Sequence, residues 1–208
     1  MKYKAILFDI DGTLLDTEQK VIISLQHALL RMTNTFYPEE SLYSCLGLPG
    51  KDGLRKLGIA PEKIDYVHSA WEEYDKDYPV PSQLFQGIKE LLILLKASHI
   101  KLGIVTSQTH LEYAYTFRDY TIAKIFDFCI CSDDTEHPKP SPDPLLRVMK
   151  QFSYTPDELL YIGDTIYDLQ CACTAGVDFA LALWGAHDPD NTPAEYRLTH
   201  PRDLLHFL

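Results

Sequence analysis

Two aspartates, one residue apart, follow a short apolar segment near the start of the chain. The segment spans residues 4–8, and the acids are Asp9 and Asp11, followed directly by Gly12 and Thr13. An apolar run of this length predicts a buried strand, and residues two apart on a strand point to the same side. Crowded carboxylates repel each other, and a cation such as Mg²⁺, which prefers oxygen ligands, relieves that repulsion. The spacing therefore predicts a metal site where the first strand ends.

More polar residues follow the next predicted strands. They are Thr106 and Ser107 after the second strand, Lys139 after the third, and Asp164 and Asp168 after the fourth. The carboxyl ends of parallel strands gather at one edge of a sheet, so these side chains are expected to lie together. Such a set suits phosphoryl transfer: a hydroxyl and a lysine donate to phosphate oxygens beside Mg²⁺, and one carboxylate attacks phosphorus. The expected partner is a small phosphorylated metabolite.

The elements that position these residues alternate between strand and helix after residue 80. Strands are expected at residues 4–8, 100–105, 126–131, 159–162 and 179–183, with helices between them. Five strands separated by helices predict an α/β fold, a Rossmann-like parallel sheet covered by helices on both faces.

Residues 17–80 have a different pattern. Apolar residues recur there at three- and four-residue spacings, and Pro38 and Pro61 stand where helices are expected to begin. No convincing strand is visible between Asp16 and Tyr78. We therefore expect an inserted α-helical cap subdomain at residues 17–80, with the catalytic core formed by residues 1–16 and 81–208.

Composition excludes several classes of protein. Hydrophobic residues make up 46% of the 208, which suffices for a core, and the net charge is −11 without a run of lysine or arginine. This balance argues against nucleic acid or an anionic membrane surface as partner. The longest apolar run, residues 88–100, is interrupted by charged residues and is too short for a membrane span. The oligomeric state is left open, and a monomer is compatible with the sequence.

The cysteines suggest a reducing compartment. Their number is five, and the first predicted strand begins too early for a signal peptide, so a cytoplasmic protein is expected. Cys129 and Cys131 lie in a predicted strand, and Cys171 and Cys173 lie in a predicted helix. Neither pair has the Cys-x-x-Cys spacing of a zinc site, so buried thiols are the expectation.

Four segments resemble the motifs of the haloacid dehalogenase-like hydrolase superfamily, in the family's order and spacing. They are residues 9–13 for the first motif, 105–107 for the second, 139–144 for the third and 163–168 for the fourth. The helical insert resembles the cap of the phosphoglycolate phosphatase and β-phosphoglucomutase branch. The resemblance spans the whole chain and implies a Mg²⁺-dependent phosphatase that hydrolyses a small phosphomonoester through an aspartyl phosphate.

The resemblance also implies roles for single residues. Asp9 is expected to be the nucleophile and a Mg²⁺ ligand, and Asp11 the general acid and base, with its backbone carbonyl as a second ligand. Asp164 is the expected third ligand. Asp168 is expected to support the metal ligands or Lys139 from behind.

The phosphoryl group has its own expected partners. Thr106, Ser107 and the close-approaching backbone of Gly12 are expected to bind it. Lys139 is expected to neutralise its charge and to position Asp9. Ser107 departs from the asparagine that is frequent in the family, without removing a required chemical group.

Simpler interpretations stand beside these roles. Asp9 and Asp11 could be turn acids after a strand, Asp168 could only stabilise a helix dipole, and Lys139 could be a surface lysine. Two other functions also remain: a β-phosphoglucomutase-like mutase that uses the same phosphoaspartate, and a non-catalytic binding protein on the same fold.

The cap is expected to contact the rest of the substrate. A turn at residues 47–51 is the candidate loop for this contact. Lys51 and Arg55 could then bind a second anionic group of the substrate, and an exposed charged turn is the alternative. The linkers near Asp16 and at residues 79–81 are expected to act as hinges.

Overall fold

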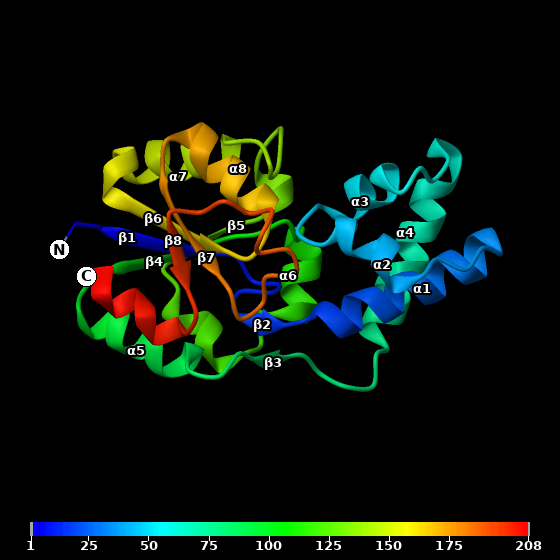
Figure 1. The fold of residues 1–208 in the computed structure, drawn as a ribbon, viewed down its shortest axis with the longest axis horizontal. Helices are drawn as coiled ribbons and strands as arrows, with labels where there is room; N and C mark the ends of the chain where they lie inside the picture. The colour runs from blue at the N-terminus through cyan, green and yellow to red at the C-terminus, as the bar shows by residue number, and fades with distance from the viewer. Residues whose placement is uncertain (1, 208) are drawn as a thin grey trace.

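The computed structural model describes residues 2–207 and places the strands named below in one parallel sheet (Figure 1). The strand order is β5-β4-β1-β6-β7-β8. The strands are β1 (Ala5–Phe8), β4 (Lys101–Val105), β5 (Phe128–Ile130), β6 (Leu159–Gly163), β7 (Asp178–Ala182) and β8 (Tyr196–Leu198). The neighbouring pairs all run parallel, which confirms the predicted α/β class.

The sheet has one strand more than the five that were expected. The additional strand is β8, at the edge next to β7. It is only three residues long, and its central residue, Arg197, is exposed. A segment this short and polar has no apolar run by which the sequence predicts a strand.

Helices cover both faces of the sheet, as expected. They are α5 (Ile88–Ala97), α6 (His110–Thr116), α7 (Asp143–Phe152) and α8 (Ile166–Ala175), with short 3₁₀ helices η2 (Thr121–Ile125), η3 (Ser132–Asp134), η4 (Pro156–Glu158) and η5 (Pro201–Phe207). Ile6 and Phe8 belong to the apolar cluster that contains α5, whereas Leu7 belongs to the cluster that contains α7 and α8. This alternation follows from the two-residue period of a strand.

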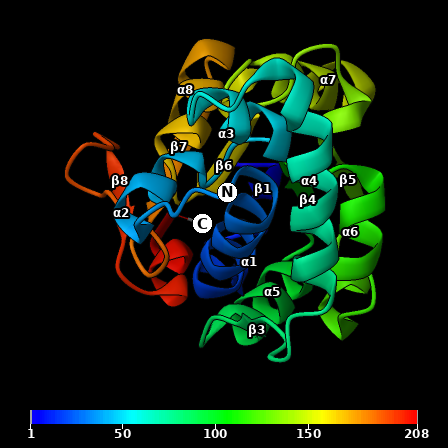
Figure 2. The same ribbon diagram turned by 90° about the vertical axis from the view of Figure 1, so that its right-hand side faces the viewer.

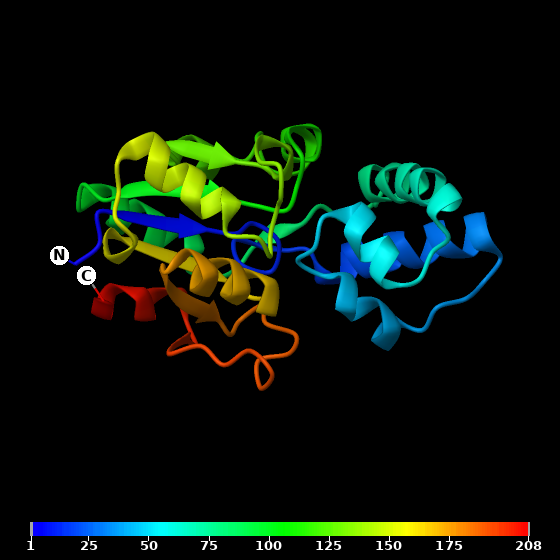
Figure 3. The ribbon, with the colours of Figure 1, turned by 90° about the horizontal axis from the view of Figure 1, so that it is seen from above.

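The inserted segment forms a separate helical body with its own core. Its helices are α1 (Glu18–Thr33), α2 (Glu39–Leu42), η1 (Tyr43–Cys45), α3 (Gly50–Lys56) and α4 (Pro61–Lys76). A third cluster of buried apolar residues, from Ile22 to Ala70, is formed by these helices and by Ile59 in the loop between α3 and α4. Figures 1 and 3 show this cap beside the sheet, joined to it by a short antiparallel pair of strands, β2 (Leu15–Asp16) and β3 (Gln83–Leu84).

The cysteine expectation is only partly correct. All five thiols are free; Cys45, Cys131 and Cys171 are buried, and Cys129 is half-buried. Cys173, however, is exposed, because it stands on the solvent side of α8 while Cys171 faces the sheet. In residues 2–207, no helix combines the length and apolar character that crossing a membrane requires.

The cap core gives a first prediction. Leu29 is fully buried in the cap cluster, whereas its neighbour Leu30 is 45% exposed. Leu29→Ala should destabilise the protein by about 2–5 kcal/mol, because it removes buried apolar surface and leaves a cavity. Leu30→Ala is the matched control and should change stability by less than about 1 kcal/mol. Denaturant unfolding measures both values, and equal losses would contradict a separate packed core in the cap.

Candidate active site

The chain turns sharply after β1, and this turn shapes the site. The carbonyl of Ile10 accepts hydrogen bonds from the backbone of Thr13 at 3.2 Å and of Leu14 at 2.8 Å. Gly12 has a φ of 76°, a region that favours glycine. A Cβ at this position would also collide with the carboxylate of Asp164. Glycine is therefore required at position 12, because the loop after β1 approaches Asp164 closely.

A buried ion-pair network lies behind the turn. Lys139 is 1% exposed, and its Nζ lies 2.9 Å from Asp9 Oδ1 and 2.7 Å from Asp168 Oδ1. The same Nζ donates to the hydroxyl of Tyr161 at 3.0 Å. That hydroxyl is also 2.7 Å from Asp168 Oδ1 and 3.0 Å from the carbonyl of Val105. The network thus fixes the ammonium beside Asp9.

Mutual charge keeps Lys139 and Asp168 ionised despite their burial. Burial alone would lower the pKa of Lys139, but Asp168 and Asp9 outweigh it and raise the pKa above its ordinary value. Burial alone would raise the pKa of Asp168, but Lys139 and the hydroxyls of Thr165 and Tyr161 lower it. A charged lysine at this depth is stable only because both carboxylates surround it.

Three buried carboxylates meet at the carboxyl ends of β1 and β6. One oxygen from each of Asp9, Asp164 and Asp168 lies within 4.8 Å of the others. Burial raises the pKa of Asp9 to about 7, although the charge of Lys139 opposes this rise. Burial also raises the pKa of Asp164 well above its usual range. Within the described chain, Asp9 Oδ1 has no hydrogen-bond partner besides its ionic contact with Lys139. Crowded, desolvated oxygens of this kind fit a hard divalent cation.

Asp168 differs from the other two acids. Its Oδ1 contacts Lys139 and Tyr161, and its Oδ2 accepts from the backbone of Thr165 at 3.1 Å and from its hydroxyl at 2.6 Å. Both of its oxygens are therefore already in use. Asp9 and Asp164 remain the side chains suited to hold a cation, and Asp168 is placed to support Lys139.

Asp11 is held by residues that the sequence analysis did not identify. Its Oδ2 accepts from Gln108 Nε2 at 2.7 Å, and Gln108 Oε1 accepts from the hydroxyl of Thr116 at 2.6 Å. Burial raises the pKa of Asp11, and the hydrogen bond from Gln108 opposes that rise. Because Gln108 lies 97 residues from Asp11 in sequence, no local pattern indicates the contact.

A cavity of about 410 Å³ opens in front of these acids, between the core and the cap. Figure 2 shows the molecule from the cap side, with the cap helices α1 and α4 in front of the sheet. Of the residues predicted for the site, Asp9, Asp11, Gly12, Ser107 and Asp164 line the cavity. Thr106, Lys139 and Asp168 are buried behind that wall. The hydroxyl of Thr106 accepts from the backbone of Gln108 at 3.2 Å.

The cap loop enters the site through its backbone. Ser107 Oγ donates to the carbonyl of Gly47 at 2.7 Å, and a Cβ on Gly47 would collide with the side chain of Thr165. The loop after η1 thus lies between residues that follow β4 and β6.

The structure does not bring Lys51 and Arg55, the expected ligands of a second anionic group, to the cavity. Neither residue lines the cavity. Lys51 Nζ pairs with Asp65 Oδ1 at 2.7 Å, and Arg55 pairs with Asp52. The physical reason is that α3 begins at Gly50, which turns both side chains toward acids on the outside of the cap. These two cations therefore form the exposed charged turn that was the alternative.

Two further residues in the core were missed. Trp184 Nε1 donates to the carbonyl of Thr13 at 2.9 Å, and a Cβ on Gly185 would collide with the carbonyl of Gly12. They follow the end of β7, so the position at a strand end was the available signal. Their packing braces the turn that carries Asp9 and Asp11.

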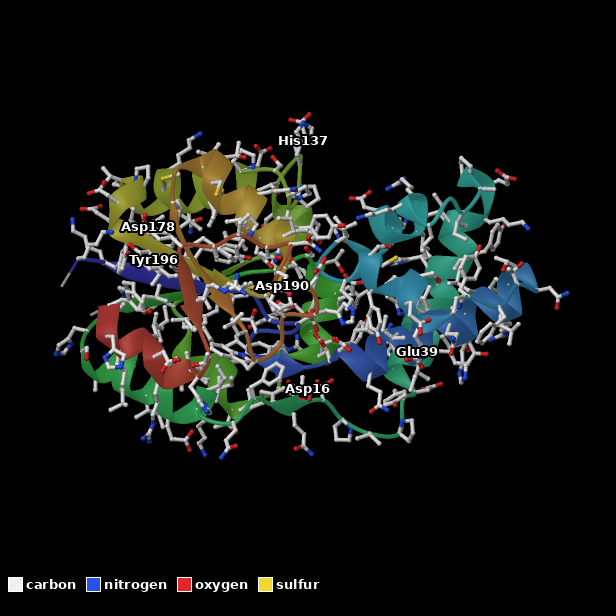
Figure 4. All side chains as sticks on the ribbon, in the orientation of Figure 1. Asp16, Glu39, His137, Asp178, Asp190 and Tyr196 are labelled. Atoms are coloured by element: carbon white, nitrogen blue, oxygen red, sulfur yellow. The ribbon has the colours of Figure 1, made fainter. Side chains whose placement is uncertain are left out.

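One polar cluster near the site has structural partners, and one nearby histidine is exposed. His110, Cys131 and Asp133 place ligand atoms near one another. Asp133 Oδ1, however, accepts from the backbone of His110 at 3.0 Å, and His110 Nε2 lies 2.9 Å from Asp134. These contacts connect the start of α6 to η3. His137 is exposed on the outside of the loop that carries Lys139, as Figure 4 shows.

Fold and site together define a class of protein. It is an α/β protein with a helical cap, in which the end of the first strand places an aspartate beside a buried lysine. The model of the haloacid dehalogenase-like hydrolases matches residues 6–182. The chain therefore belongs to the haloacid dehalogenase-like hydrolase family, which confirms the resemblance predicted from the four motifs.

Individual relatives agree with this assignment. The chain is 30% identical over 206 residues to the pyrophosphatase PpaX of Bacillus velezensis, covering 97% of this chain and 94% of the relative. A candidate phosphoglycolate phosphatase from Lactobacillus plantarum has 31% identity and a TM-score of 0.91, with both chains fully covered. A candidate haloacid dehalogenase-like hydrolase from Bacteroides fragilis has 25% identity and a TM-score of 0.87 over 98% of this chain and 100% of that one.

The buried network gives a second prediction. Tyr161→Phe keeps the ring but removes the hydroxyl that contacts Lys139, Asp168 and the Val105 carbonyl. We expect a loss of about 1–3 kcal/mol in the free energy of unfolding, because buried polar groups lose a partner. Tyr66→Phe, at a ring that is 68% exposed, is the control and should be neutral. A neutral Tyr161→Phe measured by denaturant unfolding would show that the hydroxyl does not stabilise the network.

Proposed function

We propose that this hydrolase is a Mg²⁺-dependent phosphatase that acts on a small phosphomonoester through an aspartyl phosphate. One observation carries the proposal: the carboxylate of Asp9 lines a capped cavity while its Oδ1 lies 2.9 Å from the buried ammonium of Lys139. An ionised carboxylate in a shielded cavity, beside a fixed cation, is suited to attack phosphorus and form a covalent intermediate.

The proposed reaction has two steps. Asp9 attacks phosphorus, the bond from phosphorus to the ester oxygen breaks, and Asp11 gives that oxygen a proton. Water then attacks the phosphorus of the aspartyl phosphate while Asp11 takes its proton, and the bond to Asp9 breaks to release phosphate. Gln108 supports this role, because its amide holds the Asp11 carboxylate at 2.7 Å.

The remaining residues bind charge. Asp9, Asp164 and the backbone carbonyl of Asp11 would hold Mg²⁺, which when bound neutralises part of the phosphoryl charge. Lys139 compensates the charge that develops on Asp9 and the phosphoryl group, and Asp168 positions Lys139. Thr106, Ser107 and the backbone at Gly12 are the proposed phosphoryl ligands.

The cap is proposed to close over this site as a unit. We place its boundaries at residues 17–80, with hinges near Asp16 and at residues 79–81. Asp16 lies where the core meets the cap (Figure 4). Closure would exclude water until the ester is bound, and opening would release the products.

The nucleophile gives a third prediction. Asp9→Asn should reduce phosphate release from small phosphomonoesters at least about 1,000-fold, because an amide oxygen cannot form the aspartyl phosphate. Asp157→Asn, at an exposed residue outside the site, is the control and should leave turnover unchanged. The assay uses excess Mg²⁺ with phosphate detection, and circular dichroism checks the fold. Chelation of Mg²⁺ should abolish turnover by the unmodified protein.

Two results would contradict this proposal. Retained activity of Asp9→Asn would exclude the covalent mechanism. Isomerisation of β-glucose 1-phosphate without phosphate release would indicate the mutase instead. The panel therefore includes sugar phosphates, nucleotides, phosphoglycolate and pyrophosphate.

Gln108 gives a fourth prediction, which separates positioning from binding. Gln108→Ala should lower kcat for an alkyl phosphate by about 10- to 100-fold, because a freed Asp11 protonates the leaving oxygen poorly. With p-nitrophenyl phosphate, whose leaving group needs little protonation, the loss should be much smaller. Gln151→Ala, at an exposed site on α7, is the control. Equal losses with both esters would assign Gln108 to folding or binding.

A further inference from the structure

The charges around the cavity point to the chemistry of the leaving group. Six charged residues line the cavity away from the predicted metal ligands, among the described residues 2–207. They are the acids Glu18, Glu72, Asp75 and Glu112 and the lysines Lys20 and Lys76. Acids therefore exceed lysines by four to two where the non-reacting part of a substrate must lie.

Of the two lysines, one is held in an ion pair and the other is exposed to solvent. Lys20 Nζ lies 2.8 Å from Asp75 Oδ2, and both side chains are mostly buried, with exposures of 17% and 14%. Lys76 is exposed to solvent, and its Nζ lies 4.4 Å from the centre of the Tyr115 ring. The first charge is neutralised in place, and solvent screens the second.

Two of the acids lie beside the same cap histidine, one from the cap and one from the core. Glu72 on α4 lies 3.8 Å from Nδ1 of His68, and Glu112 Oε1 on α6 lies 3.8 Å from Nε2 of the same ring. Their side chains are 25% and 17% exposed. The other oxygen of Glu112 accepts hydrogen bonds from the backbone and the hydroxyl of Thr109, at the start of α6. Even with a protonated His68, the acids outnumber the cations.

Aromatic rings complete this part of the wall. Trp71, Tyr78, Tyr115 and Tyr120 line the same cavity. Aromatic faces attract cations, and their bodies accept uncharged groups. A wall of acids and aromatic rings attracts an ammonium group and repels a carboxylate or a second phosphoryl group.

We propose that the preferred substrates are phosphomonoesters whose leaving alcohol carries an ammonium group. Alcohols with only hydroxyl groups rank next, and leaving groups with a negative charge rank last. The proposal rests on the proposed function, because it names the substrate class of that same site. It also separates this chain from relatives whose names refer to pyrophosphate and phosphoglycolate.

Three esters of similar size test the proposal as our fifth prediction. They are 2-aminoethyl phosphate, 2-hydroxyethyl phosphate and phosphoglycolate, assayed on the full chain with excess Mg²⁺. We expect kcat/KM for the amino ester to exceed that for phosphoglycolate at least about tenfold, since unit charges a few ångströms apart interact strongly at partly buried sites. The hydroxy ester should lie between them.

Variants then assign the preference to named acids. Glu72→Gln and Glu112→Gln should each reduce the ratio of amino ester to phosphoglycolate about threefold, because each removes one negative charge from the wall. Glutamine also keeps the capping contact of Glu112. Glu73→Gln is the matched control: it is adjacent to Glu72, 62% exposed, paired with Arg31, and outside the cavity. A ratio measured on one sample does not depend on the fraction that is folded.

The outcomes separate this proposal from the one on which it rests. Turnover of all three esters with equal or reversed preference would overturn the charge proposal and leave the phosphatase intact. A ratio that Glu72→Gln and Glu112→Gln do not change would overturn it as well. Failure to hydrolyse these esters and p-nitrophenyl phosphate would contradict the phosphatase itself.

Discussion

The buried ammonium of Lys139 is the interaction on which the rest of the site depends. It lies between Asp9 and Asp168, at 2.9 Å and 2.7 Å, in a region that water does not reach. Without it, acids from β1 and the start of α8 would repel each other at the centre of the sheet. Asp168 has both oxygens occupied, so it serves the lysine, and Asp9 is left facing the cavity. One cation thus separates an acid that holds the lysine from an acid that faces the cavity.

The surplus of acid has a consequence for binding. Burial raises the pKa of Asp9 and of Asp164, which means that one lysine does not compensate all the carboxylates at this sheet edge. The proposed Mg²⁺ and the phosphoryl charge would balance each other there. Farther from the sheet the wall stays acidic, because four acids line it against two lysines. The two halves of the cavity therefore suit the two ends of an amino-substituted phosphate ester.

Cap and core are packed separately, because the core has two apolar clusters and the cap has a third. Their contacts include polar groups: Ser107 with the Gly47 carbonyl, and His68 with Glu112. Polar contacts of this kind exchange with water at low cost, whereas the two cores remain packed. This difference is what a hinged cap requires, and it agrees with the thin β2–β3 connection.

The sequence by itself determined the family, the α/β class, the helical cap and the acids and lysine at the strand ends. Those features depend on local patterns: an apolar run predicts a strand, and the next residues stand at the sheet edge. Only the tertiary structure decided which side chains meet. It joined Gln108 to Asp11 across 97 residues, brought Glu112 of the core to His68 of the cap, and turned Lys51 away from the cavity. The physical reason is that such contacts depend on how separate elements pack, and a periodic pattern carries no information about partners distant in the chain.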